Sequence, residues 1–97
     1  MAIRFEWDPR KAQANWSRHR VSFEQARDVF KDTMALDEPD EREDYGEERW
    51  NCVGLVEGRL LVVSYTERID EGSGDEIIRI ISARPAEPRE RKRYHEA

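Results

Sequence analysis

Apolar and polar residues alternate over residues 2–7, a two-residue repeat that is typical of a short half-buried strand. Asp8 and Pro9 follow, and they predict the start of a helix because Asp8 can cap free backbone amides and proline fits the first helical turn. Residues 22–25 have the form of a capping box and predict a second helix. One face of each predicted helix carries residues with helical spacing: Ala12, Trp16 and His19 in the first, and Phe23, Ala26, Val29 and Phe30 in the second.

After the second helix the pattern returns to strands. Four are predicted, at residues 34–36, 50–56, 60–66 and 77–83. A tight turn at Glu57-Gly58 makes the middle two a hairpin, and the last strand is apolar enough on both sides to be central in a sheet. Residues 86–96 predict a basic, mostly exposed helix. The order β-α-α-β-β-β-β-α therefore predicts one α+β domain over residues 1–97, with the helices packed on one face of an antiparallel sheet.

Composition narrows the classes of protein. Charged residues make up 40% of the chain and hydrophobic residues 37%, so the core must be small and the surface densely ionic. A single cysteine, Cys52, excludes an internal disulfide and a multi-cysteine zinc site, and its apolar neighbours indicate a buried small side chain. No signal peptide, membrane-length apolar stretch, metal-binding motif or phosphate loop is found, so we expect a cytoplasmic protein without metal or cofactor.

The net charge of -5 at first argues against a nucleic-acid ligand, but the charges are unevenly distributed. Residues 37–48 contain eight acids and one base, Arg42, which leaves 14 acids and 16 bases in the rest of the chain. A basic face therefore remains once the acidic run is set aside. The acidic run itself is interpreted as a solvated loop that keeps a basic-faced protein soluble. The alternative is a segment that mimics nucleic acid or binds cations.

Four side chains stand out as candidates for chemistry. His19 falls near the end of the first predicted helix, where it either bonds to backbone carbonyls or acts as a general acid or base. Arg79 lies inside the apolar last strand, so its charge needs either a carboxylate partner or a phosphate. Regular alternation would place Arg79 and Arg84 on opposite faces of that strand. Tyr65 alternates with apolar residues, and we expect it in the core with its hydroxyl at the rim.

Three segments in order resemble the BrnT toxin family over nearly the whole chain. The first comprises Phe5–Pro9, Lys11-Ala12, Asn15, His19, Val21–Glu24 and Ala26. The second comprises Gly46–Arg49, Gly54, Gly58-Arg59 and Val62–Arg68. The third comprises Arg79–Ala86, Glu90-Arg91 and Tyr94. The chain departs from the family pattern at Arg18, where many relatives have lysine, at Asp32-Thr33, which replaces a common Asp-Pro, and in a longer loop at residues 70–76.

This resemblance implies a RelE-like fold and a metal-independent ribonuclease that arrests translation. It also implies a BrnA-type antitoxin whose ribbon-helix-helix domain binds DNA and whose other part wraps the toxin, so that DNA is contacted only through the antitoxin. Such cleavage uses the ribose 2′-hydroxyl as nucleophile, and the protein must move protons and stabilise the phosphorane. Arginine stays protonated and serves only the second task. The proton carriers must then come from His19, Tyr65, Tyr94 or a carboxylate such as Glu47.

The candidate site residues follow from these roles. The catalytic candidates are His19, Arg79, Arg84 and Tyr65, and the RNA-binding candidates are Arg49, Arg68 and Arg91. Of these, we expect His19 to carry the proton and the arginines to hold phosphates. The alternative function is a non-catalytic interaction module, in which the basic face binds an acidic segment of a partner and no RNA is cut.

Overall fold

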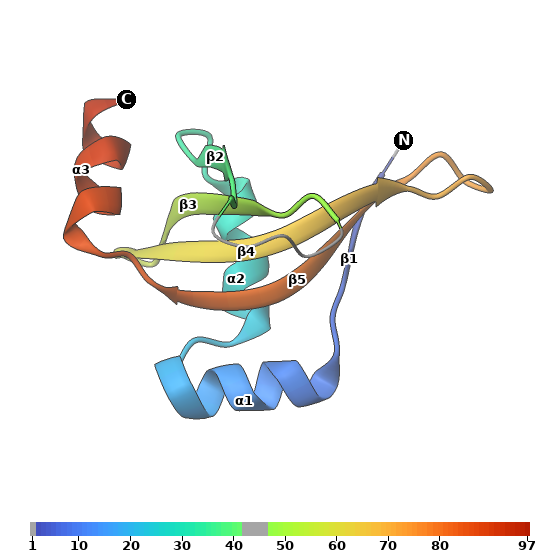
Figure 1. Cartoon of the computed structure of the whole chain (residues 1–97), viewed down its shortest axis with the longest axis horizontal. Coiled ribbons are helices and arrows are strands. Elements are labelled where there is room, and N and C mark those ends of the chain that lie inside the picture. The colour runs from blue at the N-terminus through green and yellow to red at the C-terminus, as the bar shows by residue number, and fades with distance from the viewer. Residues whose placement is uncertain (1, 42–46) are drawn as a thin grey trace.

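The computed structural model describes residues 2–41 and 47–97. Its strands form a five-stranded sheet in the order β1-β5-β4-β3-β2, as Figure 1 shows. The strands are β1 (Ile3–Glu6), β2 (Leu36–Pro39), β3 (Trp50–Val56), β4 (Arg59–Ile69) and β5 (Glu76–Pro85). The helices are α1 (Pro9–His19), α2 (Phe23–Asp28), the 3-10 turn η1 (Val29–Lys31) and α3 (Pro88–Glu96). The predicted α+β class and the order of elements are confirmed.

Local signals in the sequence explain where both N-terminal helices begin. The Asp8 carboxylate accepts a hydrogen bond from the Arg10 backbone amide at 2.8 Å, and Pro9 opens α1. Ser22 and Gln25 form a reciprocal capping box at the start of α2. Helix α1 ends at His19, because the next residue, Arg20, adopts a left-handed conformation with φ of 54°. The predicted position of His19 at a helix end is therefore confirmed.

Strand pairing is antiparallel throughout the sheet except between β1 and β5, which run parallel. Strand β1 pairs with residues 76–79 of β5, so along the second half of β5 the edge that faces away from β4 lies next to α1. There the Asn15 side chain of α1 accepts a hydrogen bond from the Ala83 backbone amide at 3.0 Å and donates one to the Val21 carbonyl at 2.9 Å. Asn15 is buried and fixes α1 against β5.

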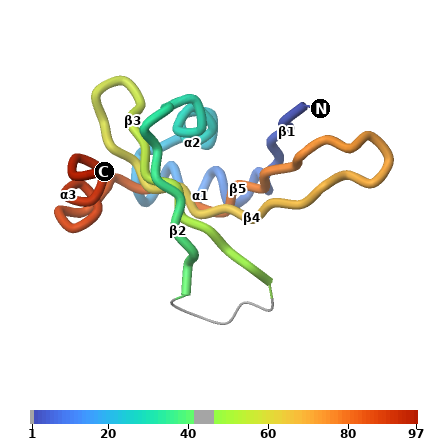
Figure 2. Tube along the Cα trace, turned by 90° about the horizontal axis from the view of Figure 1, so that it is seen from above, coloured from blue at the N-terminus to red at the C-terminus, as the bar shows by residue number. Residues whose placement is uncertain are grey.

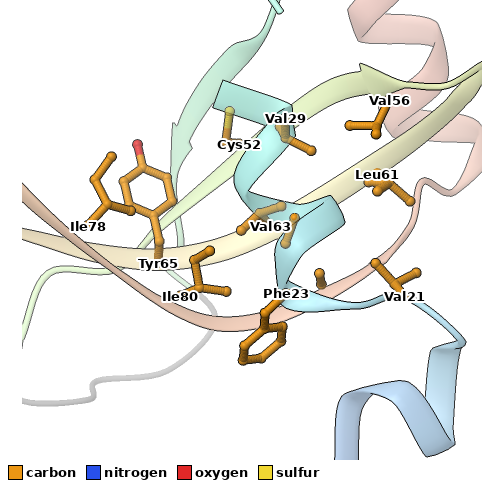
Figure 3. Close-up of a cluster of buried hydrophobic side chains, with 12 residues drawn as sticks. Val21, Phe23, Val29, Cys52, Val56, Leu61, Val63, Tyr65, Ile78 and Ile80 are labelled. Atoms are coloured by element: carbon orange, nitrogen blue, oxygen red, sulfur yellow. The ribbon is translucent and has the colours of Figure 1, made fainter. Parts of the chain in front are cut away.

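The main core lies between the sheet and the helices α1 and α2 (Figure 3). Its buried members are Val21, Phe23, Ala26, Val29, Cys52, Val56, Leu61, Val63, Tyr65, Ile78, Ile80 and Ala83. Cys52 is buried, as expected, and burial raises the pKa of its thiol. Gly54 lies where η1 approaches β3, since a Cβ atom there would sit 2.8 Å from Val29 Cγ1 and 3.0 Å from the Val29 carbonyl oxygen.

The expectation that all helices pack on one face is wrong, because α3 packs on the other. Val53 and Val62 point away from the main core and form a second small cluster with Ala86, against which Leu60 and Tyr94 pack. Strands β3 and β4 are apolar on both faces near their turn. The apolar face that does not meet the main core must therefore be shielded from water by another element. Figure 1 shows α3 at that end of the sheet, with α1 below β5.

An irregularity in β5 changes which side chains share a face. Ser82 pairs with Ser64, but Ile80 pairs with Tyr65, so Ile81 is an extra residue without a partner in β4. A regular strand, as the sequence predicts, would place Arg79 and Arg84 on opposite faces. The bulge reverses the alternation between them, and both arginines point to the face opposite the main core.

The hairpin of β4 and β5 extends beyond the rest of the sheet, as Figure 2 shows.

None of the helices in the described part of the chain has the length and apolar character of a membrane span.

Candidate functional site

A hollow of about 300 Å³ lies between α1 and β5. Its polar lining residues are Lys11, Asn15, Arg18 and His19 from α1 and Ser64, Ser82 and Arg84 from the sheet. Among the residues that the structure describes, no carboxylate lines this hollow. The hollow therefore combines an imidazole with three basic side chains, which favours an anionic ligand.

The helical repeat explains how α1 contributes several polar residues to one hollow. Positions 11, 15 and 18 are separated by four and three residues, so they lie above one another on one side of the helix. His19 follows them at the end of the helix and is half-buried. The Asn15 hydrogen bond to Ala83 fixes the distance between this side of α1 and β5.

A second hollow of about 200 Å³ lies on the α3 side of Arg84. Its lining residues are Glu38, Pro39, Asp40, Glu41, Asn51, Val53, Arg84, Arg89, Glu90 and Arg93. Arg84 lines both hollows and so stands between α1 and α3. Here the charges are mixed, and Arg93 forms an ion pair with Glu38 at 2.9 Å. The α1 hollow is the better anion site because acids offset the bases in this one.

Arg84 is held in place by Glu90 of α3. Its Nη1 and Nη2 atoms donate to the two oxygens of the Glu90 carboxylate at 2.8 and 2.7 Å, a bidentate geometry. Burial of Glu90 opposes ionisation, but the hydrogen bonds from Arg84 and from the Glu87 backbone amide keep the pKa of this carboxyl below its ordinary value. The guanidinium is thereby oriented before a ligand arrives, with its side chain 26% exposed.

Uncharged polar side chains from three neighbouring strands lie beside Arg84. The Ser64 hydroxyl donates to Asn51 Oδ1 at 2.7 Å, and Ser82 is directly opposite Ser64 in the adjacent strand. Hydroxyl and amide groups of this kind can bond to hydroxyls or base edges without repelling a phosphate.

Arg79 lies on the same sheet face, opposite Thr66 of β4. Its side chain is exposed, and it forms no ion pair with any described residue. The sequence left two partners open for Arg79, a carboxylate or a phosphate. Within the described residues, the carboxylate partner is not observed. The β4 partners of Arg79 and Arg84 are Thr66 and Val62. They are four positions apart, which corresponds to about 14 Å along the strand.

The other predicted site residues lie outside both hollows. Tyr65 lies on the main-core face of the sheet (Figure 3), where its hydroxyl donates to Asp37 Oδ1 at 2.7 Å. Burial and the Asp37 carboxylate raise the pKa of this hydroxyl. Arg49 immediately precedes β3, with its Nε 3.9 Å from Glu47 Oε1. Arg91 Nε donates to the Ala86 carbonyl at 3.3 Å.

Arg68 lines a hollow of about 670 Å³ beside β1 and the β4–β5 hairpin. The charges there are already paired: Arg68 with Glu6 at 3.1 Å, and Arg4 with Asp70 at 2.6 Å. This hollow is larger than the one at His19 but has no excess of positive charge, which makes it the poorer candidate.

The sequence pattern did not mark Lys11, Arg89 or Arg93 as functional residues, and Arg18 stood out only as a departure from the family pattern. The seven-residue spacing of Lys11 and Arg18 could have placed both on the side of α1 that carries Asn15. In the acidic run, Asp37 and Glu38 belong to β2, while residues 42–46, which include Arg42, Glu43 and Asp44, lie outside the described residues. Gly46 of the family pattern is also outside them.

Comparison with known proteins supplies the family. A family model described as "Ribonuclease toxin, BrnT, of type II toxin-antitoxin system" matches residues 7–90. Comparison with curated proteins finds no match. The family match spans α1, the whole sheet after β1 and the start of α3, and so includes His19, Arg79, Arg84 and Glu90. The chain therefore belongs to the BrnT family of ribonuclease toxins of type II toxin-antitoxin systems.

Proposed function

We propose that the protein cleaves RNA without a metal ion in the hollow between α1 and β5. The observation that carries this proposal is the meeting of His19 with Lys11, Arg18 and Arg84 in a hollow that no described carboxylate lines. The imidazole can transfer a proton, and the three cations can hold phosphates. These are the two tasks that the reaction requires.

In the proposed reaction, the ribose 2′-oxygen forms a bond to the adjacent phosphorus and the bond from phosphorus to the 5′-oxygen breaks. The 2′-hydroxyl loses a proton and the 5′-oxygen gains one. His19 carries one of these protons, and water in the open hollow carries the other. Arg84, oriented by Glu90, stabilises the negative charge of the phosphorane. Lys11 and Arg18 bind neighbouring phosphates of the RNA backbone.

The proposal gives Tyr65 a structural role, because its hydroxyl bonds to Asp37 on the opposite side of the sheet from Arg84. Arg49, Arg68 and Arg91 contribute at most to long-range attraction of RNA, since each contacts protein groups outside the hollow.

The test replaces His19 by alanine and measures cleavage of single-stranded RNA with EDTA present. We expect the rate to fall by about 10²–10⁴-fold, as for other positioned proton carriers. His95→Ala is the matched control, because His95 is the other histidine and is exposed on α3. Undiminished cleavage by folded His19→Ala would remove His19 from the mechanism. Wild-type cleavage that stops in EDTA and returns with a divalent cation would disprove metal independence.

In the cell, we propose that this cleavage arrests translation and that a BrnA-type antitoxin with a ribbon-helix-helix domain neutralises the protein. Expression of wild type should stop incorporation of labelled amino acids, whereas His19→Ala and Arg84→Gln should not. Co-expression of the antitoxin should restore incorporation. If His19→Ala arrests translation as strongly as wild type, the alternative of a non-catalytic interaction module gains support.

A further inference from the structure

Arg79 is exposed on the sheet face opposite the main core, yet the proposed reaction gives it no role. Its neighbours on that face are Thr66 in β4 and Glu6 in β1. The Glu6 carboxylate forms an ion pair with Arg68 at 3.1 Å. Arg79 itself forms no ion pair with a described residue, so its charge is available to a ligand.

The bulge at Ile81 is the reason that Arg79 and Arg84 share a face. Without the extra residue, a strand separation of five positions would direct the two side chains to opposite sides. Bulges frequently redirect side chains next to functional sites. Ile81 also lines the α1 hollow, so the bulge occurs where the proposed site begins.

The surface between the two arginines is polar and uncharged. Ser82 and Ser64 occupy it, with Asn51 hydrogen-bonded to Ser64 on the adjoining strand. Between the pair Arg79–Thr66 and the pair Arg84–Val62, the described residues of β4 and β5 include no acidic side chain. A phosphodiester chain can therefore follow β5 from one arginine to the other without meeting a like charge.

We propose that Arg79 is a second phosphate-binding subsite, and that single-stranded RNA lies along β5 from Arg84 to Arg79. The proposal rests on the proposed RNA cleavage at Arg84. The spacing of about 14 Å between the two positions exceeds what one nucleotide's phosphate can contact, so the ligand is an extended strand of several nucleotides. Base-paired RNA fits less well, since α1 and α3 flank Arg84 and leave hollows of about 300 and 200 Å³.

The first experiment compares Arg79→Gln with wild type on a dinucleotide substrate and on longer single-stranded RNAs. For the longer RNAs we expect KM to rise about tenfold while kcat is unchanged, which corresponds to loss of one charge-assisted contact. For the dinucleotide, neither constant should change. Arg59→Gln is the control, because Arg59 is an exposed arginine of the same sheet but belongs to the main-core face, opposite the face of Arg79. Equal effects of the two substitutions, or an equal effect on the dinucleotide, would overturn the proposal.

The second experiment tests the face on which the charge must lie. Thr66→Arg introduces an arginine directly opposite position 79 on the same face and should restore KM in the Arg79→Gln protein. Glu67→Arg adds more positive charge, but on the other face, and should not restore it. Restoration by Glu67→Arg as large as that by Thr66→Arg would show that only net charge matters and would contradict a defined subsite.

Binding is measured separately with RNA whose 2′-hydroxyls are replaced by hydrogen, because such a strand cannot be cleaved. Wild type should bind this probe, His19→Ala should bind it equally, and Arg79→Gln should bind it about tenfold more weakly. Binding that does not depend on Arg79 would disprove the second subsite alone. Absence of binding by wild type would disprove the proposed RNA site as well. Equal binding of duplex and single-stranded RNA would contradict the single-strand path.

Discussion

Asn15 joins three parts of the chain through one side-chain amide. Its oxygen accepts from the Ala83 amide in β5, and its nitrogen donates to the Val21 carbonyl in the turn after α1. Both backbone groups are shielded from water, so loss of either bond leaves a buried group unpaired. The sequence offered Asn15 only as one member of a family pattern. An asparagine inside a helix gives no sign of which distant backbone groups it will contact.

Replacing Asn15 by alanine should lower the free energy of unfolding by about 2–3 kcal/mol, the cost of leaving buried partners unsatisfied. Urea denaturation measures this change. Gln13→Ala is the control, because Gln13 is exposed on the same helix and should change stability by less than about 0.5 kcal/mol. Similar midpoints for the two variants would show that the Asn15 bonds contribute little.

Tyr65→Phe separates a structural hydroxyl from a catalytic one. We expect RNA cleavage within about twofold of wild type, since the lost group faces Asp37 and not the α1 hollow, while stability falls by about 1 kcal/mol. Cleavage assays and urea denaturation of one preparation give both values. A hundredfold loss of cleavage at unchanged stability would return Tyr65 to the catalytic candidates.

At the scale of elements, α3 depends on polar contacts more than on buried apolar surface. Arg84 binds Glu90, Glu38 binds Arg93, and the Tyr94 hydroxyl donates to Asp32 Oδ2 at 2.5 Å. The hydrogen bond from Tyr94 also helps to keep the pKa of Asp32 below its ordinary value of 3.8.

Acid should therefore loosen α3 before it unfolds the sheet. The pKa values of Asp32 and Glu90 are both lowered by folding, so their stabilising contribution is complete above the ordinary values of 3.8 and 4.5 and is lost as pH falls through the lowered ones. Hydrogen exchange should show amide protection in α3 falling below about pH 4 while protection in β4 persists. Asp32→Asn should shrink this pH dependence, and Glu96→Gln, at an exposed position of α3, should not. Simultaneous loss of protection in α3 and β4 would contradict the prediction.

The order of elements could be predicted because each has a local signal, such as the capping box at Ser22 or the turn at Glu57-Gly58. Three features could not. The parallel pairing of β1 with β5 joins segments more than 70 residues apart. The bulge at Ile81 is hidden because residues 77, 78, 80 and 81 are all isoleucine, so the strand is apolar in either alternation. The position of α3 depends on which face of the sheet is left uncovered.

At the scale of the whole molecule, segregation of charge explains how a protein with a net charge of -5 can present a basic site. Lys11 and Arg18 come from α1, whereas Arg79 and Arg84 come from the opposite end of the sequence. Only folding brings them together. The sequence therefore singled out a histidine and an arginine, His19 and Arg84, that line the proposed site. It could not show that His19 and Arg84 line one hollow while Tyr65 lies on the other side of the sheet.

RNA affinity should depend on salt in proportion to the phosphates that these cations contact. With four contacts, the logarithm of the binding constant should fall against the logarithm of salt concentration with a slope of about -3. Fluorescence anisotropy with the uncleavable strand measures the slope, and Lys11→Gln should reduce its magnitude by about 0.7. Arg27→Gln, at an exposed position of α2, should leave it unchanged. A slope near zero would mean that binding is not governed by phosphate contacts.

The Asn15 amide also has a consequence for how the protein behaves at high concentration. An open strand edge offers backbone groups to a strand of another molecule and is a common origin of aggregation. Beyond residue 79, β5 would offer such an edge, but Asn15 already occupies the Ala83 amide. The outer strands β1 and β2 are four residues each, and β2 ends in a proline. In a toxin released from its antitoxin, these features limit the strand edge that another copy could pair with.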